Sequence, residues 1–253
     1  MIQKNSTISA IVIAKNEEKR ISTCLKALSF CSEIIVVDNG SVDNTFGIAA
    51  KLGATVIQSA FHDFAELHNL AYKEAKSDWL LYVDADEIIN DELKQFILGV
   101  LNEGKSGYRL QRKNYYLGKP WPKTEYLVRL IRRDALVGWQ GVLHETAIVK
   151  GEIGDVPGFL LHDTHRTLEE MVAKTNEWSA VEAKLRFDAG HPKVVPWRLL
   201  RVFFTGFVNT YFRDGGWKAG TVGLIESLYQ GFSLFITYAK LWEMQKRNDV
   251  SAH

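Results

Sequence analysis

The sequence predicts an α/β fold in which a mixed, mainly parallel sheet carries helices on both faces, followed by a helical C-terminal extension. Over residues 8–100, short apolar runs typical of buried strands alternate with stretches of helical period. Strands that alternate with helices in this way pair in parallel, and the helices cover both faces of the sheet. After Pro192 and Pro196 come two apolar, aromatic stretches separated by "RDGGWKAG". These stretches indicate amphipathic helices beyond the sheet.

The elements of the first hundred residues follow from this alternation. The expected strands span residues 8–14, 33–37, 55–58 and 79–83. The expected helices span residues 17–30, 44–52 and 64–75, and a further helix begins near Asp91. In such sheets ligands bind at the carboxyl ends of the strands. Functional side chains are therefore expected directly after Ala14, Val37 and Val83.

Residues 105–160 change character and are expected to add mixed strands to the sheet. Strand-like runs at residues 108–112, 126–131 and 147–149 are separated by turn signals, one of them at residues 137–141. Helices are then expected at residues 167–187, 197–212 and 221–242, the first with a capping box of Thr167 and Glu170. The expected domains are a sheet-bearing domain, residues 1–160, and a helical, aromatic and basic region, residues 161–253, for acceptor or membrane association.

The composition is that of an ordinary globular protein. Of the 253 residues 46% are hydrophobic and 24% are charged, and the formal net charge is +1. The whole chain therefore offers no electrostatic attraction for nucleic acid. Cys24 and Cys31 lack metal-ligand spacing and are expected to be buried, reduced thiols. The apolar run at residues 8–14 is too short for a signal peptide, so a cytoplasmic location is expected.

The C-terminal region combines positive charge with aromatic side chains. Residues 193–247 hold eight Lys or Arg and three acidic residues. Amphipathic helices of this kind lie on anionic membranes, so peripheral attachment to the cytoplasmic face of the inner membrane is expected. Glu226, Gln230 and Lys240 interrupt the second apolar stretch and disfavour a spanning helix. The alternative is that these helices pack on the domain or form a homodimer.

Polar motifs follow the first two strands, "AKNEE" and "VVDNGSVDNT". Asp38 ends a buried strand and leads into a tight turn, so its side chain faces the ligand edge of the sheet. There it is able to accept hydrogen bonds from a base imide or a ribose hydroxyl. The alternative is a plain turn followed by a helix N-cap.

The motif "LLYVDADE" places Asp84 and Asp86 at the end of a later strand. Two neighbouring carboxylates repel each other unless a cation or a basic residue lies between them. Hard oxygen ligands of this kind suit Mg²⁺ or Mn²⁺, which complete their coordination with waters and substrate phosphates. The motif therefore predicts a site for a metal-bound diphosphate. The alternative is a solvated turn before the helix near Asp91.

These three motifs, in this order and spacing, resemble those of glycosyltransferase family 2, whose members have the GT-A fold. The resemblance covers residues 7–150 and implies a UDP-sugar donor with Mg²⁺ or Mn²⁺. It implies uridine contacts by Asn16, Glu17 and Asp38, ribose and diphosphate contacts by Asp84, and metal ligation by Asp86. The full set that it places at the donor consists of Ala14, Asn16, Glu17, Asp38, Asn69 and Asp84. Where an Arg-Asn pair is common in the family, this chain has His68-Asn69, so a charged diphosphate contact from position 68 is not implied.

Longer stretches resemble the bacterial lipopolysaccharide core β-glucosyltransferases within that family. They are "YLVRLIRRDALVGWQGVLHET", "LHDTHRTLEEMVAKTNEWS" and the aromatic "FFTGFVNTYFRDGGWKAGTVGL" with "YAKLWE". This resemblance implies transfer of a hexose, glucose in that branch, to a lipid-linked or oligosaccharide acceptor of the cell envelope such as lipopolysaccharide core.

Displacement at an anomeric carbon needs a cation for the leaving diphosphate and a base for the acceptor hydroxyl. The metal on Asp86 supplies the first, and Glu145 in "LHET" is the expected base, with Asp163 in reserve. A base opposite the leaving group gives inversion. The alternative for Glu145 and its neighbour is a polar pair at a strand end. Five further residues are expected to contact an acceptor or phosphates: Arg129, Arg132, His144, His162 and His165. For the histidines the alternative is a structural polar contact.

Three other function classes compete with this interpretation. A haloacid-dehalogenase-like phosphatase would carry its aspartyl motif on the first strand, whereas at least three strands precede "DADE". A nucleotidyltransferase would need a Gly-rich phosphate loop after the first strand, and "AKNEEKR" has none. The third is a non-catalytic, membrane-peripheral protein that binds a glycan or nucleotide on a transferase fold, against which the intact acidic motifs argue.

Overall fold

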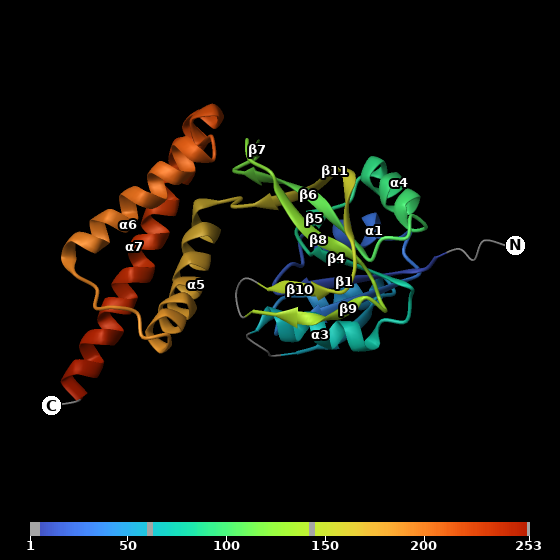
Figure 1. Cartoon of the computed structure of the whole chain (residues 1–253), viewed down its shortest axis with the longest axis horizontal. Coiled ribbons are helices and arrows are strands. Elements are labelled where there is room, and N and C mark those ends of the chain that lie inside the picture. Colours follow the sequence, from blue (N-terminus) through green and yellow to red (C-terminus); the bar gives the residue numbers. More distant parts are fainter. Residues whose placement is uncertain (1–5, 60–62, 142–144, 252–253) are drawn as a thin grey trace, which may run out of the picture. The chain divides into compact units, whose positions relative to one another are not determined.

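The computed structural model describes residues 6–59, 63–141 and 145–251 of the chain (Figure 1). The chain divides into two compact units. The sheet unit consists of Met1–Lys113 and Thr124–His162, and the helical unit consists of Asn114–Lys123 and Asp163–His253.

Nine strands form the main sheet in the described part of the chain, in the order β3-β2-β1-β4-β8-β6-β11-β5, with β7 paired to β6. The four strands at one side are parallel: β1 (Ile8–Ala14), β2 (Glu33–Asp38), β3 (Thr55–Gln58) and β4 (Trp79–Asp84). The antiparallel pairings involve β5 (Glu87–Ile88), β6 (Gly107–Tyr116), β7 (Lys119–Pro120), β8 (Glu125–Arg132) and β11 (Ile153–Thr164). The sheet is therefore mixed, as predicted.

Helices cover both faces because successive side chains of a strand point to opposite faces. In β1, Val12 packs on one side with α1 (Ile21–Ala27), α2 (Thr45–Lys51) and α4 (Asp91–Val100). Ile11 packs on the other side with α3 (Phe64–Glu74) and with the hairpin of β9 (Leu136–Gln140) and β10 (Thr146–Val149). Figure 1 shows this hairpin beside α3. The predicted helices on both faces are thus confirmed.

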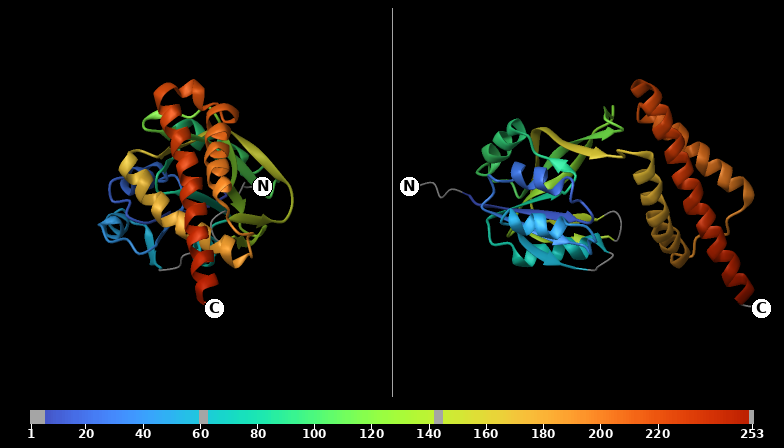
Figure 2. Two further views of the ribbon diagram at one scale, coloured as in Figure 1. Left: turned by 90° about the vertical axis from the view of Figure 1, so that its left-hand side faces the viewer. Right: turned by 180° about the vertical axis from the view of Figure 1, so that it is seen from behind.

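The helical unit is built from three helices that lie side by side in Figures 1 and 2, α5 (Leu168–Asp188), α6 (Pro196–Val208) and α7 (Gly220–Ser251). A π-helical turn, Asn209–Arg213, and a 3₁₀ turn, Gly216–Ala219, connect α6 to α7. The two helices approach closely at glycines: a Cβ added to Gly231 would lie 2.7 Å from the Phe203 carbonyl oxygen. The predicted helical extension is confirmed. No helix among the described residues has the length and apolarity needed to cross a membrane.

The boundaries of some elements differ from the predictions. The helix expected from residue 17 begins at Ile21, because the Arg20 N–H closes a turn on the Glu17 carbonyl. The predicted turn at residues 137–141 was wrong, since Leu136–Gln140 is the strand β9. Thr167 caps α5 as predicted, accepting the Glu170 N–H at 3.1 Å, and the Glu170 carboxylate accepts from Arg166 Nε at 3.0 Å.

Candidate functional site

The loops that follow β1 and β2 are locked together at the carboxyl edge of the sheet. Ala14 pairs with Asp38 in register, and the Asn39 N–H donates to the Ala14 carbonyl at 2.8 Å. Asn16 has a φ of 57°, a left-handed conformation that asparagine tolerates better than most residues. Its N–H donates to Ser41 Oγ at 2.9 Å, and its Oδ1 accepts the Val42 N–H at 2.8 Å. The sequence thus folds the two motifs into one surface.

Within this surface Asp38 is almost completely buried, at 1% exposure. Its Oδ1 accepts the Ser41 N–H at 3.2 Å, which fixes the turn that the sequence indicated. The Glu17 N–H donates to Thr45 Oγ1 at 2.8 Å, and the Glu17 carboxylate pairs with Arg20 at 2.6 Å. Four of the residues expected at the donor, Ala14, Asn16, Glu17 and Asp38, therefore lie on adjoining strand ends.

Asp84 ends β4 and is held by arginines from the neighbouring strands. Arg129 of β8 makes a bidentate contact, with Nη2 donating to Oδ2 at 2.7 Å and Nη1 donating to Oδ1 at 3.4 Å. Arg112 Nη1 of β6 lies 3.8 Å from Asp84 Oδ2. Behind them Glu87, which is fully buried, accepts from both arginines at 3.3 Å. This explains how acidic residues cluster at a strand end: they share two guanidinium groups.

The electrostatics of this cluster fix the charge of Asp84. Burial alone would raise the pKa of Asp84, but the Arg129 guanidinium outweighs burial and holds the pKa well below its usual range. Burial raises the pKa of Glu87, and Arg129 only partly offsets this effect. Asp84 is therefore a fixed anion beside two cations.

Asp86, in the turn that follows β4, lies beside His162. His162 Nε2 of β11 is 3.4 Å from Asp86 Oδ1, and both side chains are largely buried. His162 reaches this point because it pairs with Glu87 across the β5–β11 ladder. No group of three or more His, Cys, Asp or Glu within the described ranges is arranged to hold a metal by itself. One carboxylate and one imidazole fit an ion that completes its coordination with waters and substrate phosphates.

The β9–β10 hairpin carries Glu145 toward the sheet and is positioned by α3. Asn69 of α3 binds the backbone of Trp139 twice: its Nδ2 donates to the carbonyl at 3.0 Å and its Oδ1 accepts the N–H at 2.9 Å. His68, 2% exposed, stacks on the Trp139 ring at 4.3 Å, and its Nε2 lies 3.7 Å from Glu145 Oε1. Burial lowers the pKa of His68, which keeps the ring neutral. Glu145 therefore faces a buried, uncharged imidazole.

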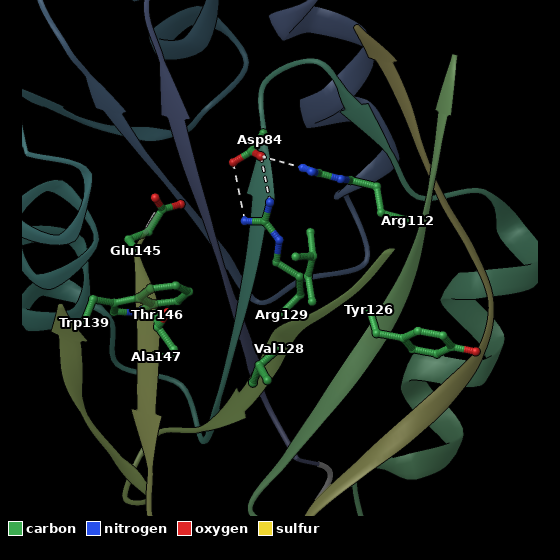
Figure 3. Close-up of a pocket in the computed structure, with 10 residues that line it drawn as sticks. Asp84, Arg112, Tyr126, Val128, Arg129, Trp139, Glu145, Thr146 and Ala147 are labelled. Atoms are coloured by element: carbon green, nitrogen blue, oxygen red, sulfur yellow. Dashed lines mark hydrogen bonds and ion pairs between the residues drawn. The ribbon is translucent and has the colours of Figure 1, made fainter. Parts of the chain in front are cut away.

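Asp84, its two arginines and Glu145 border a pocket of about 450 Å³ in the sheet unit. Asp84, Arg112 and Arg129 form one wall, and Trp139 and Glu145 form the other. Figure 3 shows Glu145 across the pocket from Asp84 and the two arginines. The pocket thus offers a carboxylate on one side and a paired cationic site on the other.

Other predicted site residues lie elsewhere or outside the described ranges. Arg132 pairs with Trp79 at the far end of the β4–β8 ladder, where its Nε contacts Asp134 at 2.6 Å, so the structure does not bring it to Asp84. His165 belongs to the helical unit, and its Nδ1 lies 2.9 Å from a Glu226 carboxylate oxygen. His144 lies outside the described residues.

Sequence reasoning missed three residues of this site: His68, Glu87 and Arg112. Arg112 and Glu87 meet 25 positions apart in the sequence, through the pairing of strands that carry no shared motif. For His68 a signal was present, since it replaces the arginine that is common before the metal motif. The sequence did not show that its ring would turn toward Glu145.

The sequence of this chain is similar to those of known glycosyltransferases. The profile of "Glycosyl transferase family 2" matches residues 9–149. The lipopolysaccharide core biosynthesis glycosyltransferase LpsC of Rhizobium meliloti is 27% identical over 252 residues, which cover 93% of this chain and 92% of LpsC. An uncharacterized glycosyltransferase of Rickettsia typhi is 27% identical over 97% of this chain and 90% of its own.

Among solved structures, that of Staphylococcus aureus TarS 1–349 in complex with UDP-GlcNAc is similar to this chain. The match covers 96% of this chain and 92% of the TarS chain, with 16% identity and a TM-score of 0.48. The family profile spans more than half of the 253 residues and includes β1, β2, β4 and the hairpin that carries Glu145. The chain therefore belongs to glycosyl transferase family 2, and it is a nucleotide-sugar-dependent glycosyltransferase.

Proposed function

We propose that the protein transfers a hexose, with glucose as the first candidate, from a UDP-sugar to a cell-envelope glycan such as lipopolysaccharide core, with inversion at the anomeric carbon. The observation that carries this proposal is the pocket itself, in which Glu145 faces Asp84 and two arginines. A leaving diphosphate needs positive charge, and an attacking hydroxyl needs a base. The pocket supplies these two requirements from opposite walls.

The donor is proposed to bind along the carboxyl edge of the parallel strands. Asn16, Glu17 and Asp38 would surround the uridine, because their loops are locked together beside the end of β4. Asp84 would accept from the ribose and adjoin the diphosphate. Asn69 would support donor binding indirectly, because both polar atoms of its amide bind the Trp139 backbone and hold the hairpin in place.

Asp86 and His162 are proposed to hold the divalent cation that accompanies the diphosphate. When bound, the cation would take up negative charge that develops on the leaving UDP. An imidazole ligand favours a transition metal, so Mn²⁺ is expected to support activity better than Mg²⁺. The adjoining guanidinium groups of Arg112 and Arg129 are the protein's own positive charge at this wall.

Glu145 is proposed to accept the proton of the attacking hydroxyl. Its side chain is partly exposed to the pocket, whereas His68 behind it is buried. A base that is placed across from the leaving group directs the hydroxyl to the opposite face of the sugar, which produces inversion in one step. The His68 ring lies 3.7 Å from Glu145, and because it is neutral it adds no positive charge that would weaken Glu145 as a base.

The acceptor class is supported by the similarity to LpsC, which extends over nearly the whole of both chains. The test is a donor screen with purified protein, Mn²⁺, several UDP-sugars and a truncated lipopolysaccharide core acceptor. We expect UDP release and a core enlarged by one hexose with one donor, glucose being the first candidate. Binding of UDP-sugars without any transfer would favour the non-catalytic alternative, and no binding of any UDP-sugar would refute the donor assignment.

We also propose that the helical unit attaches the protein to the anionic cytoplasmic face of a membrane. Large apolar side chains lie exposed along α6 at steps of three or four residues: Trp197, Leu200, Phe204 and Val208. Arg198 and Arg201 lie 5.9 and 5.3 Å from the Trp197 ring, and the α6 sequence contains no acidic residue. Exposed aromatic residues flanked by arginine suit the interface of an anionic bilayer.

Membrane attachment predicts a specific loss of lipid binding. A variant with Trp197→Ser, Leu200→Ser and Phe204→Ser should lose at least about tenfold in affinity for phosphatidylglycerol vesicles, because it no longer buries these side chains. Cosedimentation measures this, with Phe96→Ser and Leu98→Ser, which change two exposed apolar side chains of α4 in the sheet unit, as the control. Equal binding by both variants would contradict the proposal. A loss of dimer in place of a loss of lipid binding would assign the face to a homodimer.

A further inference from the structure

Glu87 occupies an unusual position at the donor wall of the pocket. It is fully buried, at 0% exposure, at the start of β5. Its Oε2 accepts the Asp84 N–H at 2.9 Å, which fixes the turn after β4. Its Oε1 accepts from Arg112 Nη1 and from Arg129 Nη2, each at 3.3 Å. One carboxylate therefore binds the end of β4 and both arginines at once.

The two acids that share these arginines differ in accessibility. The Asp84 side chain is 35% exposed and lines the pocket, whereas the Glu87 side chain is inaccessible. A ligand that enters the pocket can therefore replace Asp84 as the partner of Arg129 but cannot reach Glu87. The contact with Glu87 is shielded from the pocket, whereas the contact with Asp84 borders it.

The charge arrangement shows what Glu87 contributes. Arg129 is 5% exposed, and its Nε has no hydrogen-bond partner in the described part of the chain. Arg112 is also held from the solvent side by Glu125 at 2.6 Å. Without Glu87, two neighbouring guanidinium groups would repel each other, and Arg129 would keep Asp84 as its counter-ion among these residues. Asp84 would then be withdrawn from donor binding.

We propose that Glu87 is a positioning residue that holds Arg112 and Arg129 at the pocket wall for the diphosphate of the donor. The inference rests on the proposed function, because it takes a nucleoside diphosphate as the entering anion. Arginine binds phosphate oxygens through its planar fork of donors. Arg129 passes from the Asp84 carboxylate to the diphosphate while Glu87 keeps its position, and Asp84 is released to accept from the ribose. Part of the affinity for UDP therefore comes from the protein's own cations.

The test compares UDP binding by the wild type and by Glu87→Gln, using calorimetry once with Mn²⁺ and once with EDTA. Because Arg112 and Arg129 are no longer held at the pocket wall and Arg129 keeps Asp84 as its counter-ion, Glu87→Gln should bind UDP about tenfold more weakly under both conditions. The KM for the donor should rise correspondingly, and the KM for the acceptor should stay within about twofold. The matched control is Asp155→Asn, which breaks an exposed ion pair with Arg109, a residue of the same strand β6 as Arg112. This variant should bind UDP like the wild type.

A second variant covers the case in which Glu87→Gln fails to fold. Arg112→Lys keeps the charge but loses the planar fork, and it should weaken UDP binding severalfold in Mn²⁺ and in EDTA. Unchanged UDP affinity in a folded Glu87→Gln variant would overturn the inference, and so would a loss confined to Mn²⁺, which would assign the effect to the metal. If the wild type itself binds no UDP, the donor assignment fails. If the wild type transfers sugar and the variants bind UDP with the affinity of the wild type, the donor assignment stands and only this inference fails.

Discussion

Replacing Glu145 with glutamine should lower kcat by about 10²- to 10⁴-fold, the range that a general base typically contributes. Glutamine has nearly the same size but cannot accept the proton of the attacking hydroxyl. The KM for the donor should change little, since the donor contacts lie on the opposite wall with Asp84 and Arg129. Steady-state kinetics with the donor and acceptor found in the screen measure both parameters.

Two further variants sharpen the assignment of the base. His68→Phe removes a buried imidazole whose nitrogens have no hydrogen-bond partner among the described residues, so the melting temperature should not fall, while kcat should decrease. Asp163→Asn changes the reserve candidate, an exposed residue of the helical unit, and should leave kcat near the wild-type value. Full activity of Glu145→Gln together with loss of activity in Asp163→Asn would transfer the role to Asp163.

Replacing Asp86 with alanine should cost about 3 kcal/mol of transition-state stabilisation, roughly a hundredfold in rate or more, because the cation loses its carboxylate. His162→Ala should have a smaller effect, about ten- to hundredfold, since Asp86 remains. In both variants the titration of Mn²⁺ by electron paramagnetic resonance in the presence of UDP should show weaker binding. Removal of divalent cations with EDTA should abolish most of the wild-type activity.

The control for the metal variants is Asp91→Asn, in the exposed first turn of α4. Its Mn²⁺ binding and rate should match those of the wild type. Unchanged Mn²⁺ affinity in Asp86→Ala would remove Asp86 from the metal site. Full activity of the wild type in EDTA would show that the guanidinium groups suffice for the leaving diphosphate.

The parts of the fold that could be predicted are those whose signal is local. β1 and β3 have the predicted bounds, and β2 and β4 are one residue longer. Continuous apolar runs define the buried strands β1, β2 and β4, whereas β3 is a half-exposed edge strand with apolar residues only at its centre. β11 escaped prediction since Pro157 and Gly158 interrupt it, and its partner β5 has only two residues. β9 was taken for a turn, yet it pairs antiparallel with β10, and the amide of Asn69 binds its backbone at Trp139.

For the site, too, the residues that could be predicted are those with a local signal in the sequence. The acidic residues after β1, β2 and β4 were found because strand ends carry them in sequence order. Arg129 was expected to contact an acceptor or phosphates, but its pairing with these acids was not predicted, since it lies 42 positions from Glu87 and 45 from Asp84. The pairing of arginines with carboxylates depends on strand order and register, and neither can be read directly from a single sequence. The role of Glu87 could therefore be read only from the structure.

The configuration of the transferred sugar is the most direct test of the central claim, that Glu145 directs an acceptor hydroxyl against a diphosphate held across the pocket. Nuclear magnetic resonance of the product formed from an α-linked UDP-hexose gives this configuration. A single displacement from the opposite face predicts a β-linked hexose. An α-linked product would require retention and would contradict the assignment of Glu145 as a base opposite the leaving group.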